Sequence, residues 1–405
     1  MGHAANSVFI LPPGHRWRAL RRIGTEHLLS PRQLDGLRPV MRGAVDRMLC
    51  HVSEMVAAVS AGAPVEVGRA VFAAMADLQW RAMFSSGLDA ATTRELHAVA
   101  REAALLALKP NVSDFFPALA ALDLQGIRRS MTRQLGKVYR LIDQRRRGRE
   151  AGSVDGREKD DLLDVMLQMS EVDAGGWGGG DEPGLYESIS HGKTISAFHL
   201  NLSSDEDLFL AAIDTVTGTI EWAMAELLQN PQTMKKLKEE LSRVLGSKEH
   251  VEYSDNLPYL QAVVKETLRL HAVVPLAPNK AEQTIEVQGY TIPKGSTMIV
   301  NLWAIHHNAQ VWTEPDKFIP ERFLCKEVNF QGMGFEFMPF SAGRRIYLGL
   351  PLATRMLPAL LGSLLHRFEW TLPEEAMKIG VDMSEKLGLT MSMATPLQAT
   401  VVKTL

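Results

Sequence analysis

Apolar residues recur every three or four positions along most of the chain, and this spacing predicts a mainly helical protein. The first clear helix is predicted to start at Ser30-Pro31, because serine is favoured at the N-cap and proline fits the first turn. Pro39 predicts a kink within this helix. The apolar positions that follow at helical spacing are Leu34, Leu37, Met41, Val45, Met48, Val52 and Met55.

A second group of helices is predicted between residues 203 and 271. Ser203-Ser204, followed by three acidic residues, predicts a helix start, because negative side chains in a first turn favour the helix dipole. This helix is expected to run to about Asn230-Pro231, where a second helix starts and continues to near Gly246. A third helix is predicted over Leu257–His271.

Beyond His271 the hydrophobic period changes from helical spacing to two, which is typical of strands. Ile285–Val287, a turn at Gln288-Gly289, and Tyr290–Ile292 predict a hairpin, and Thr297–Leu302 predicts a further strand. Strands and helices do not alternate along the chain, which argues against repeated βαβ units. The fold class expected is therefore mainly α with a small late β-sheet.

We interpret the 405 residues as one domain over residues 1–405, with a Gly-rich loop or insertion at residues 171–202. The apolar run from Leu348 to Leu365 contains Arg355 and two prolines, so it predicts a buried helix rather than a membrane span. The first residues match neither a signal peptide nor a myristoylation site.

Charge and cysteine content exclude several classes of function. The chain has 44 basic and 47 acidic residues, a net charge of −3, which gives no electrostatic basis for binding nucleic acid. Two cysteines, Cys50 and Cys325, cannot form a disulfide framework or a four-cysteine metal site. His306 and His307 are adjacent in a segment that resembles a strand, so their side chains are expected to point in opposite directions and not to share a metal.

Three separated segments carry the candidate chemistry. The first, residues 265–271, places Glu266 and Arg269 on one helical face, where they can pair. The second is residues 312–323, which end in Pro-Glu-Arg-Phe and include Arg322. The third is residues 337–349, a loop with the sequence Phe-Met-Pro-Phe-Ser-Ala-Gly-Arg-Arg-Ile-Tyr-Leu-Gly. An isolated Glu–Arg pair is common on protein surfaces, so only the combination is informative.

Together these segments resemble the cytochrome P450 family, with its E-x-x-R helix, P-E-R-F segment and F-x-x-G-x-R-x-C-x-G haem loop in the same order. Trp17-Arg18-Ala19-Leu20-Arg21 is similar to the W-x-x-x-R of the family, and Ala211–Thr215 to its A-G-x-D-T oxygen-binding bend. Lys109–Pro117 is similar to plant microsomal members of the geraniol-hydroxylase type. The resemblance implies a cytochrome P450 fold, haem b as cofactor, and hydroxylation of a small apolar secondary metabolite such as a terpenoid.

The resemblance also implies a role for individual residues. Asp214 and Thr215 would relay protons to iron-bound oxygen, and Glu266, Arg269 and Arg322 would form a buried structural triad. Haem also needs donors for its two propionates and close approach of the loop backbone. The residues implied in holding the cofactor are Trp17, Arg21, Phe340, Gly343, Arg345 and Gly349.

One position departs from the family pattern where the iron ligand is expected. Tyr347 stands in place of the cysteine whose thiolate favours O–O cleavage. Tyrosinate ligates haem iron in catalases, so haem binding through Tyr347 stays possible in principle. A phenol reaches further from its Cα than a thiol, so Tyr347 must clash with the porphyrin, turn aside or displace the loop. Ala212 and Asn279 also replace residues that are usual in the family.

Two functions therefore stay open. The chain is either a haem monooxygenase, or a haem-binding or haem-free relative without oxygenase chemistry. By resemblance, its partners are NADPH-cytochrome P450 reductase and a small apolar substrate, with no nucleic acid. The resemblance also implies that the protein is located at the cytosolic face of the endoplasmic reticulum membrane. Because we find no N-terminal anchor or first strands in the sequence, soluble or aggregated material is expected when the chain is expressed alone.

Overall fold

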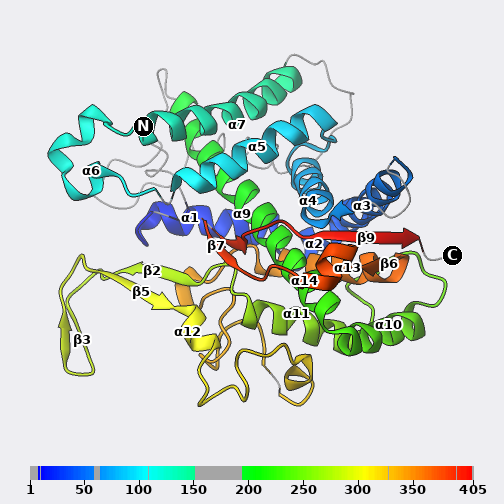
Figure 1. The fold of residues 1–405 in the computed structure, drawn as a ribbon. Coiled ribbons are helices and arrows are strands. Elements are labelled where there is room, and N and C mark those ends of the chain that lie inside the picture. The colour runs from blue at the N-terminus through cyan, green and yellow to red at the C-terminus, as the bar shows by residue number, and fades with distance from the viewer. Residues whose placement is uncertain are drawn as a thin grey trace. The chain divides into compact units, whose positions relative to one another are not determined.

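The computed structural model describes residues 8–9, 11–58, 64–107, 109–150, 194–326, 328–388 and 390–403. Helices make up most of these residues, with short antiparallel strands between and after them (Figure 1). The helices are α1 (His15–Ile23), α2 (Pro31–Gly36), α3 (Arg38–Ala58), α4 (Val67–Phe84), α5 (Ala90–Ala107), α6 (Val112–Phe115), α7 (Ile127–Glu150), α9 (Thr194–Gln229), α10 (Pro231–Leu245), α11 (Pro258–Leu270), α12 (Leu302–His306), α13 (Leu350–Arg367) and α14 (Glu374–Ile379). The prediction of a mainly helical protein is confirmed.

The strands form four small antiparallel groups. One sheet has the order β1-β9-β6, and the remaining groups are the pairs β2-β5, β3-β4 and β7-β8. The strands are β1 (Val65–Glu66), β2 (Leu276–Lys280), β3 (Ile285–Val287), β4 (Tyr290–Ile292), β5 (Thr297–Asn301), β6 (Phe368–Thr371), β7 (Glu385–Leu387), β8 (Met391–Met393) and β9 (Gln398–Lys403). The predicted hairpin at 285–292 is β3-β4, and the strand predicted from Thr297 is β5, which pairs with β2.

The described chain divides into two compact units. The first comprises residues 1–48, 71–214 and 351–353, and the second comprises 49–70, 215–350 and 354–405. The candidate residues from Thr215 to Gly349 belong to the second unit, whereas Trp17, Arg21 and Asp214 belong to the first. The expectation of one domain over residues 1–405 stays a prediction.

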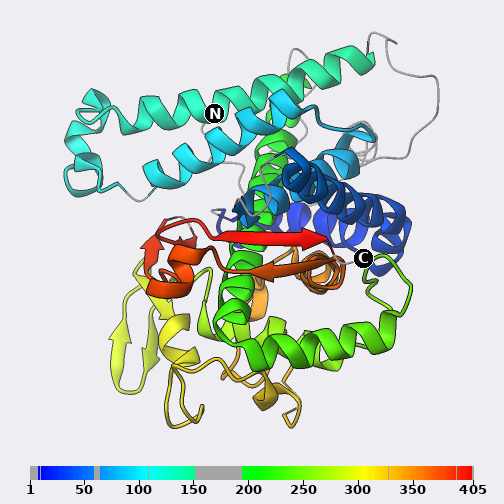
Figure 2. The same ribbon diagram turned by 45° about the vertical axis from the view of Figure 1, so that its right-hand side comes forward.

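In the first unit, α5 and α7 pack side by side (Figures 1 and 2). The buried side chains of α5 include Leu96 and Val99, and α7 contributes Val138 to the core. A buried carboxylate, Asp77 of α4, holds the connection to α5, because it accepts hydrogen bonds from the Arg81 side chain at 2.8 Å and the Leu88 N–H at 3.0 Å. Because Asp77 has these hydrogen-bond partners, its charge is not left unpaired when it is buried.

In the second unit, the three-stranded sheet shows the two-residue alternation of a half-buried strand. Phe368 and Trp370 of β6 are buried, while the residues between and after them are exposed. Trp370 lies opposite Val401 of β9. The two strands are seen as adjacent arrows that run in opposite directions (Figure 2). The sequence did not predict β6, because this strand has only four residues and directly follows the last residue of α13.

Two predicted helix boundaries are wrong. The helix from Ser30 ends at Gly36, and a new helix, α3, starts at Arg38, so Pro39 lies in a first turn and causes no kink. The helix expected to start at Ser203 starts at Thr194 instead. Serine and aspartate are good N-cap residues, but their cost inside a helix is small, so a cap signal does not force a start. Residues 171–193 of the Gly-rich segment lie outside the described residues, and residues 194–202 belong to α9.

The other boundaries follow their cap residues. The Ser30 hydroxyl accepts a hydrogen bond from the Gln33 N–H, and Gly246 ends α10 with a φ of 55°. The predicted third helix is α11, flanked by Leu257 and His271 as its cap residues. Within the described residues, none of the helices is both long enough and apolar enough to cross a bilayer.

The N-terminus of α11 is capped by a side chain from α10. Both carboxylate oxygens of Glu240 accept backbone N–H groups at 2.9 Å, one from Tyr259 and one from Leu260. These are groups of the first helical turn, which have no partner within α11. Glu240 is only 7% exposed, so the bonds are desolvated and its negative charge faces the positive end of the helix dipole.

We predict that Glu240→Gln lowers the free energy of unfolding by about 1–3 kcal/mol, because an amide can accept only one of the two N–H groups in this geometry. The matched control is Glu239→Gln on the exposed face of α10, where the nearest cation, Lys235, lies 3.9 Å away. Urea unfolding of the two variants measures the difference. Equal losses in both would contradict the capping role.

Candidate functional site

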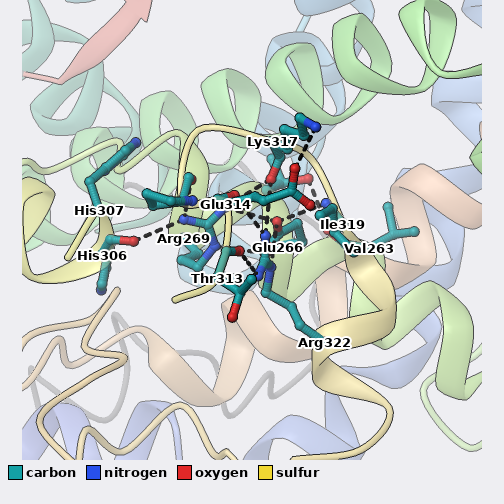
Figure 3. Close-up of polar contacts among 12 residues, drawn as sticks. Val263, Glu266, Arg269, His306, His307, Thr313, Glu314, Lys317, Ile319 and Arg322 are labelled. Atoms are coloured by element: carbon teal, nitrogen blue, oxygen red, sulfur yellow. Dashed lines mark hydrogen bonds and ion pairs between the residues drawn. The ribbon is translucent and has the colours of Figure 1, made fainter. Parts of the chain in front are cut away.

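A single buried carboxylate gathers the first two motif segments. Glu266 of α11 is fully buried and accepts two hydrogen bonds from Arg269, each 2.8 Å long. Its Oε1 atom also accepts the Arg322 Nε–H at 3.0 Å and the Ile319 N–H at 2.9 Å. The three residues of the predicted triad therefore lie together, although Arg322 is 56 residues from Glu266 in the sequence (Figure 3).

The two guanidinium groups of the triad bind backbone carbonyls in addition to the carboxylate. Arg269 donates to the carbonyls of His306 at 2.8 Å and Pro315 at 2.7 Å. Arg322 donates to the carbonyls of Thr313 at 2.7 Å and Glu314 at 3.1 Å (Figure 3). The carbonyls of Thr313, Glu314 and Pro315 belong to an irregular segment, and that of His306 ends α12. The arginines therefore supply hydrogen bonds that these groups do not find in a helix or sheet. The cluster fixes the path of residues 313–322 against α11.

His306 joins this cluster to the third motif segment. It is the last residue of α12, is fully buried, and its Nε2 atom accepts the Met338 N–H at 3.0 Å. Since a backbone N–H can only donate, the ring is neutral and carries its proton on Nδ1. Burial and, to a smaller extent, the charge of Arg269 lower the pKa of His306 to about 3. The ring thus anchors the start of the loop to the same residue whose carbonyl binds Arg269.

The loop at 337–349 is closed on itself. The Tyr347 N–H donates to the Phe340 carbonyl at 2.9 Å, and the Ile346 N–H donates to the Gly343 carbonyl at 3.1 Å. Gly343 has a φ of +65°, a conformation that a side chain disfavours, so glycine is needed there. Arg345 is half-buried, and its burial lowers the pKa of its guanidinium while the charge of Glu282 opposes that shift.

The Tyr347 side chain points across the loop. Its ring is nearly parallel to the Phe340 ring, with an angle of 11° and a centroid separation of 5.9 Å. Its outer ring atoms and hydroxyl lie directly over Gly349, because a Cβ built there would be 2.7 Å from each of them. The hydroxyl hydrogen-bonds with the Thr215 side chain of α9. Burial raises the pKa of Tyr347 to about 12, so the phenol is neutral at pH 7.

The predicted residues of the first unit have their own contacts. Trp17 of α1 is buried and donates its indole N–H to the Val8 carbonyl at 3.0 Å. The Arg21 guanidinium lies over the Trp17 ring, 5.5 Å from its centroid. Asp214 is half-buried on α9, one residue before Thr215. Of these three side chains, Trp17 belongs to the buried core, whereas Arg21 and Asp214 are half-buried.

The comparison with known proteins agrees with the order of the motifs. The sequence pattern of the family described as Cytochrome P450 matches residues 3–397, nearly the whole chain. The chain belongs to the cytochrome P450 family. Two plant relatives are each 39% identical to it. They are geraniol 8-hydroxylase of Swertia mussotii, aligned over 97% of this chain and 76% of its own, and 11-hydroxysugiol 20-monooxygenase of Salvia miltiorrhiza, aligned over 99% and 78%.

A solved structure has the same fold. A zebra fish cytochrome P450, in a structure with abiraterone, superposes with a TM-score of 0.75 over 98% of this chain and 84% of its own. The sequences are 24% identical, so this likeness concerns the fold alone. The predicted cytochrome P450 fold, mainly α with small sheets, is confirmed.

Haem is the cofactor that the family implies, and the residues described above do not fit it in their present arrangement. The family roles place the iron between Tyr347 and Thr215, yet these two side chains hydrogen-bond to each other directly. The contact between these two side chains therefore leaves no room for a haem iron between them.

Sequence reasoning missed two residues that position the site. His306 was expected in a strand-like segment and lies in a helix, where its backbone carbonyl and ring bind different partners. Glu240 was not singled out in the sequence. In neither case does a local pattern mark the residue, because its partners are 19 to 37 residues away.

We predict that Glu266→Gln lowers the free energy of unfolding by about 3–5 kcal/mol, because two buried arginines lose their counter-charge. The matched control, Glu314→Gln, removes an exposed carboxylate paired with Lys317, and we expect a change within about 1 kcal/mol. Chemical unfolding of both variants measures these losses. A Glu266→Gln loss as small as that of the control would show that the cluster does not depend on the charge.

We predict a pH dependence of stability that belongs to His306. Its folded pKa is below its ordinary value of 6.5, so acid protonates the unfolded chain first. The contribution to stability is complete above about pH 6.5 and falls by about 1.4 kcal/mol for each pH unit below that. In His306→Gln, whose amide oxygen can accept the Met338 N–H, this slope is expected to disappear.

The measurement is urea unfolding between about pH 7 and pH 5, with His51→Gln as control because the side chain of His51 is 41% exposed. Wild type and the control are expected to lose stability in parallel, and His306→Gln to lose less. Identical slopes in all three proteins would contradict the assignment.

Proposed function

We propose that the chain has the scaffold of a haem monooxygenase, an oxidoreductase that hydroxylates a small apolar secondary metabolite such as a terpenoid, and that Tyr347 reduces its oxygenase turnover to little or none. The names of its relatives, geraniol 8-hydroxylase and 11-hydroxysugiol 20-monooxygenase, support the reaction class and the kind of substrate. The family membership supports haem b as the cofactor type.

The observation that carries this proposal is the side chain at the iron-ligand position. A cysteine thiolate there donates the electron density that favours O–O cleavage. Tyr347 offers a neutral phenol in its place, with a pKa raised to about 12 by burial. An oxygen donor is harder than a sulfur donor and does not supply the electron density of a thiolate, so the rest of the scaffold is expected to lack the ligand that favours O–O cleavage.

The remaining site residues keep the roles that the resemblance gives them, as proposals. Asp214 and Thr215 are the proton-relay pair. Trp17, Arg21 and Arg345 are the proposed donors to the propionates. The proposed close contacts to the cofactor are Phe340, Gly343 and Gly349.

A second candidate function is a haem-binding or haem-free protein without oxygenase chemistry. The hydrogen bond between Tyr347 and Thr215 favours it, because it joins the two residues between which the family places the iron. The two functions differ in whether the purified chain contains haem and in whether it consumes NADPH.

For the first function, NADPH-cytochrome P450 reductase is the proposed electron donor, and the cytosolic face of the endoplasmic reticulum is the proposed location. Both follow from family membership and from the plant relatives. Co-expression of the Tyr347→Cys variant with a plant reductase, followed by NADPH-driven oxidation of a terpenoid alcohol such as geraniol, tests the partner and the substrate class together.

We predict that the wild-type chain gives no thiolate-type Soret band after dithionite and carbon monoxide, and that Tyr347→Cys gives one. Tyr347→Ser, which removes the ring without adding a thiol, is the matched control and is expected to give no such band. NADPH-driven hydroxylation by the wild-type chain at rates like those of Tyr347→Cys would overturn the proposal.

A further inference from the structure

The space between α9 and the loop at 337–349 is bridged by one side chain. Tyr347 starts from the loop, and its hydroxyl hydrogen-bonds with Thr215 on α9. Both residues belong to the second compact unit, so the bridge lies within one body. A direct contact between two side chains leaves no layer of other atoms between them.

The ring of Tyr347 has a fixed seat. It lies over Gly349, where the absence of a Cβ leaves room for it, since that atom would be 2.7 Å from the outer ring carbons and the hydroxyl. On the loop side it is parallel to Phe340, and its own N–H closes the loop on the Phe340 carbonyl at 2.9 Å. The ring is therefore held by Gly349 and Phe340, the backbone by the Phe340 carbonyl, and the hydroxyl by Thr215.

The dimensions of a metal-bound macrocycle are incompatible with this bridge. An oxygen ligand lies about 2 Å from a transition metal ion, and a non-bonded group on the opposite face stays at least about 3.5 Å away. Two hydroxyl groups on opposite faces would thus be more than about 5 Å apart, whereas an O–H···O hydrogen bond spans about 2.5–3.0 Å. The bridge must break before a haem iron can lie between the two residues.

We propose that Tyr347 is an internal plug. Its ring, seated on Gly349 and tied to Thr215, fills the place of the haem iron, so that the chain folds without haem and excludes it. This inference rests on the proposed function, because it uses the family roles of the loop and of α9. The tyrosine at the ligand position would thus change both the identity of the iron ligand and whether haem occupies the site.

The main test is a titration of the purified apo-chain with hemin, in the presence of imidazole as an external ligand, followed by Soret absorbance and by quenching of tryptophan fluorescence. Tyr347→Ala removes the plug and is expected to bind one hemin per chain at least about 10-fold more tightly than wild type, as expected when at least one hydrogen bond no longer has to break. The control, Tyr290→Ala, changes a tyrosine that is 76% exposed and is expected to bind like wild type. Wild-type chain that binds hemin as tightly as Tyr347→Ala would overturn the plug.

A second measurement avoids the loss of the whole tyrosine ring that Tyr347→Ala causes. Tyr347→Phe and Thr215→Val each remove one partner of the bridge while keeping nearly the same volume. Each is expected to lower the melting temperature, and the double variant to melt no lower than the less stable single variant, because both changes delete the same hydrogen bond. Additive losses would show that the two hydroxyl groups are not bonded, and would overturn the bridge.

The outcomes separate this inference from the proposed function. If wild type binds hemin and Tyr347→Cys gives the thiolate spectrum, the plug is wrong and the monooxygenase scaffold stands. If Tyr347→Ala binds hemin at least about 10-fold more tightly than wild type but Tyr347→Cys gives no thiolate spectrum, the plug stands and the proposed monooxygenase function fails.

Discussion

The buried charge of Glu266 is the constraint on which the rest of the second unit depends. A carboxylate without solvent requires partners, and it takes two arginines and one backbone N–H. The arginines in turn donate hydrogen bonds to carbonyls of the irregular segment at 313–315, which have no sheet or helix partner. Arg269 also donates to the carbonyl of His306, whose ring accepts the Met338 N–H. A continuous polar chain therefore runs from α11 to the start of the candidate haem loop.

This scaffold explains why the loop keeps its form although its central side chain differs from the family pattern. The positive φ of Gly343 and the hydrogen bond from Tyr347 N–H to the Phe340 carbonyl involve only backbone atoms. They do not depend on which side chain position 347 carries. A change of the ligand residue is thus compatible with an intact loop, while the chemistry available there changes from a thiolate to a neutral phenol. Scaffold and reactivity are separable in this part of the molecule.

The helical core and the small sheets could be predicted because their signals are local. Cap residues such as Ser30 and Gly246 act within one turn, and the structure has helix boundaries at both. The predictions failed where a local signal was ambiguous. The serines at 203 and 204 were interpreted as a start within what is a longer helix, and the strand β6 is too short to show a pattern. A helix continues through weak cap signals when its packing stabilises it.

The sequence by itself determined the family, the membership of the Glu266 cluster and the presence of a tyrosine at the ligand position, because motif order and residue identity are properties of the chain. Only the tertiary structure decided what these residues contact. It placed Glu240 at the first turn of α11, His306 beneath the loop, and the Tyr347 hydroxyl against Thr215. The bridge from Thr215 to Tyr347 joins residues 132 positions apart (347 − 215). No local pattern encodes such a contact, since it results from packing of α9 and the loop around a common core.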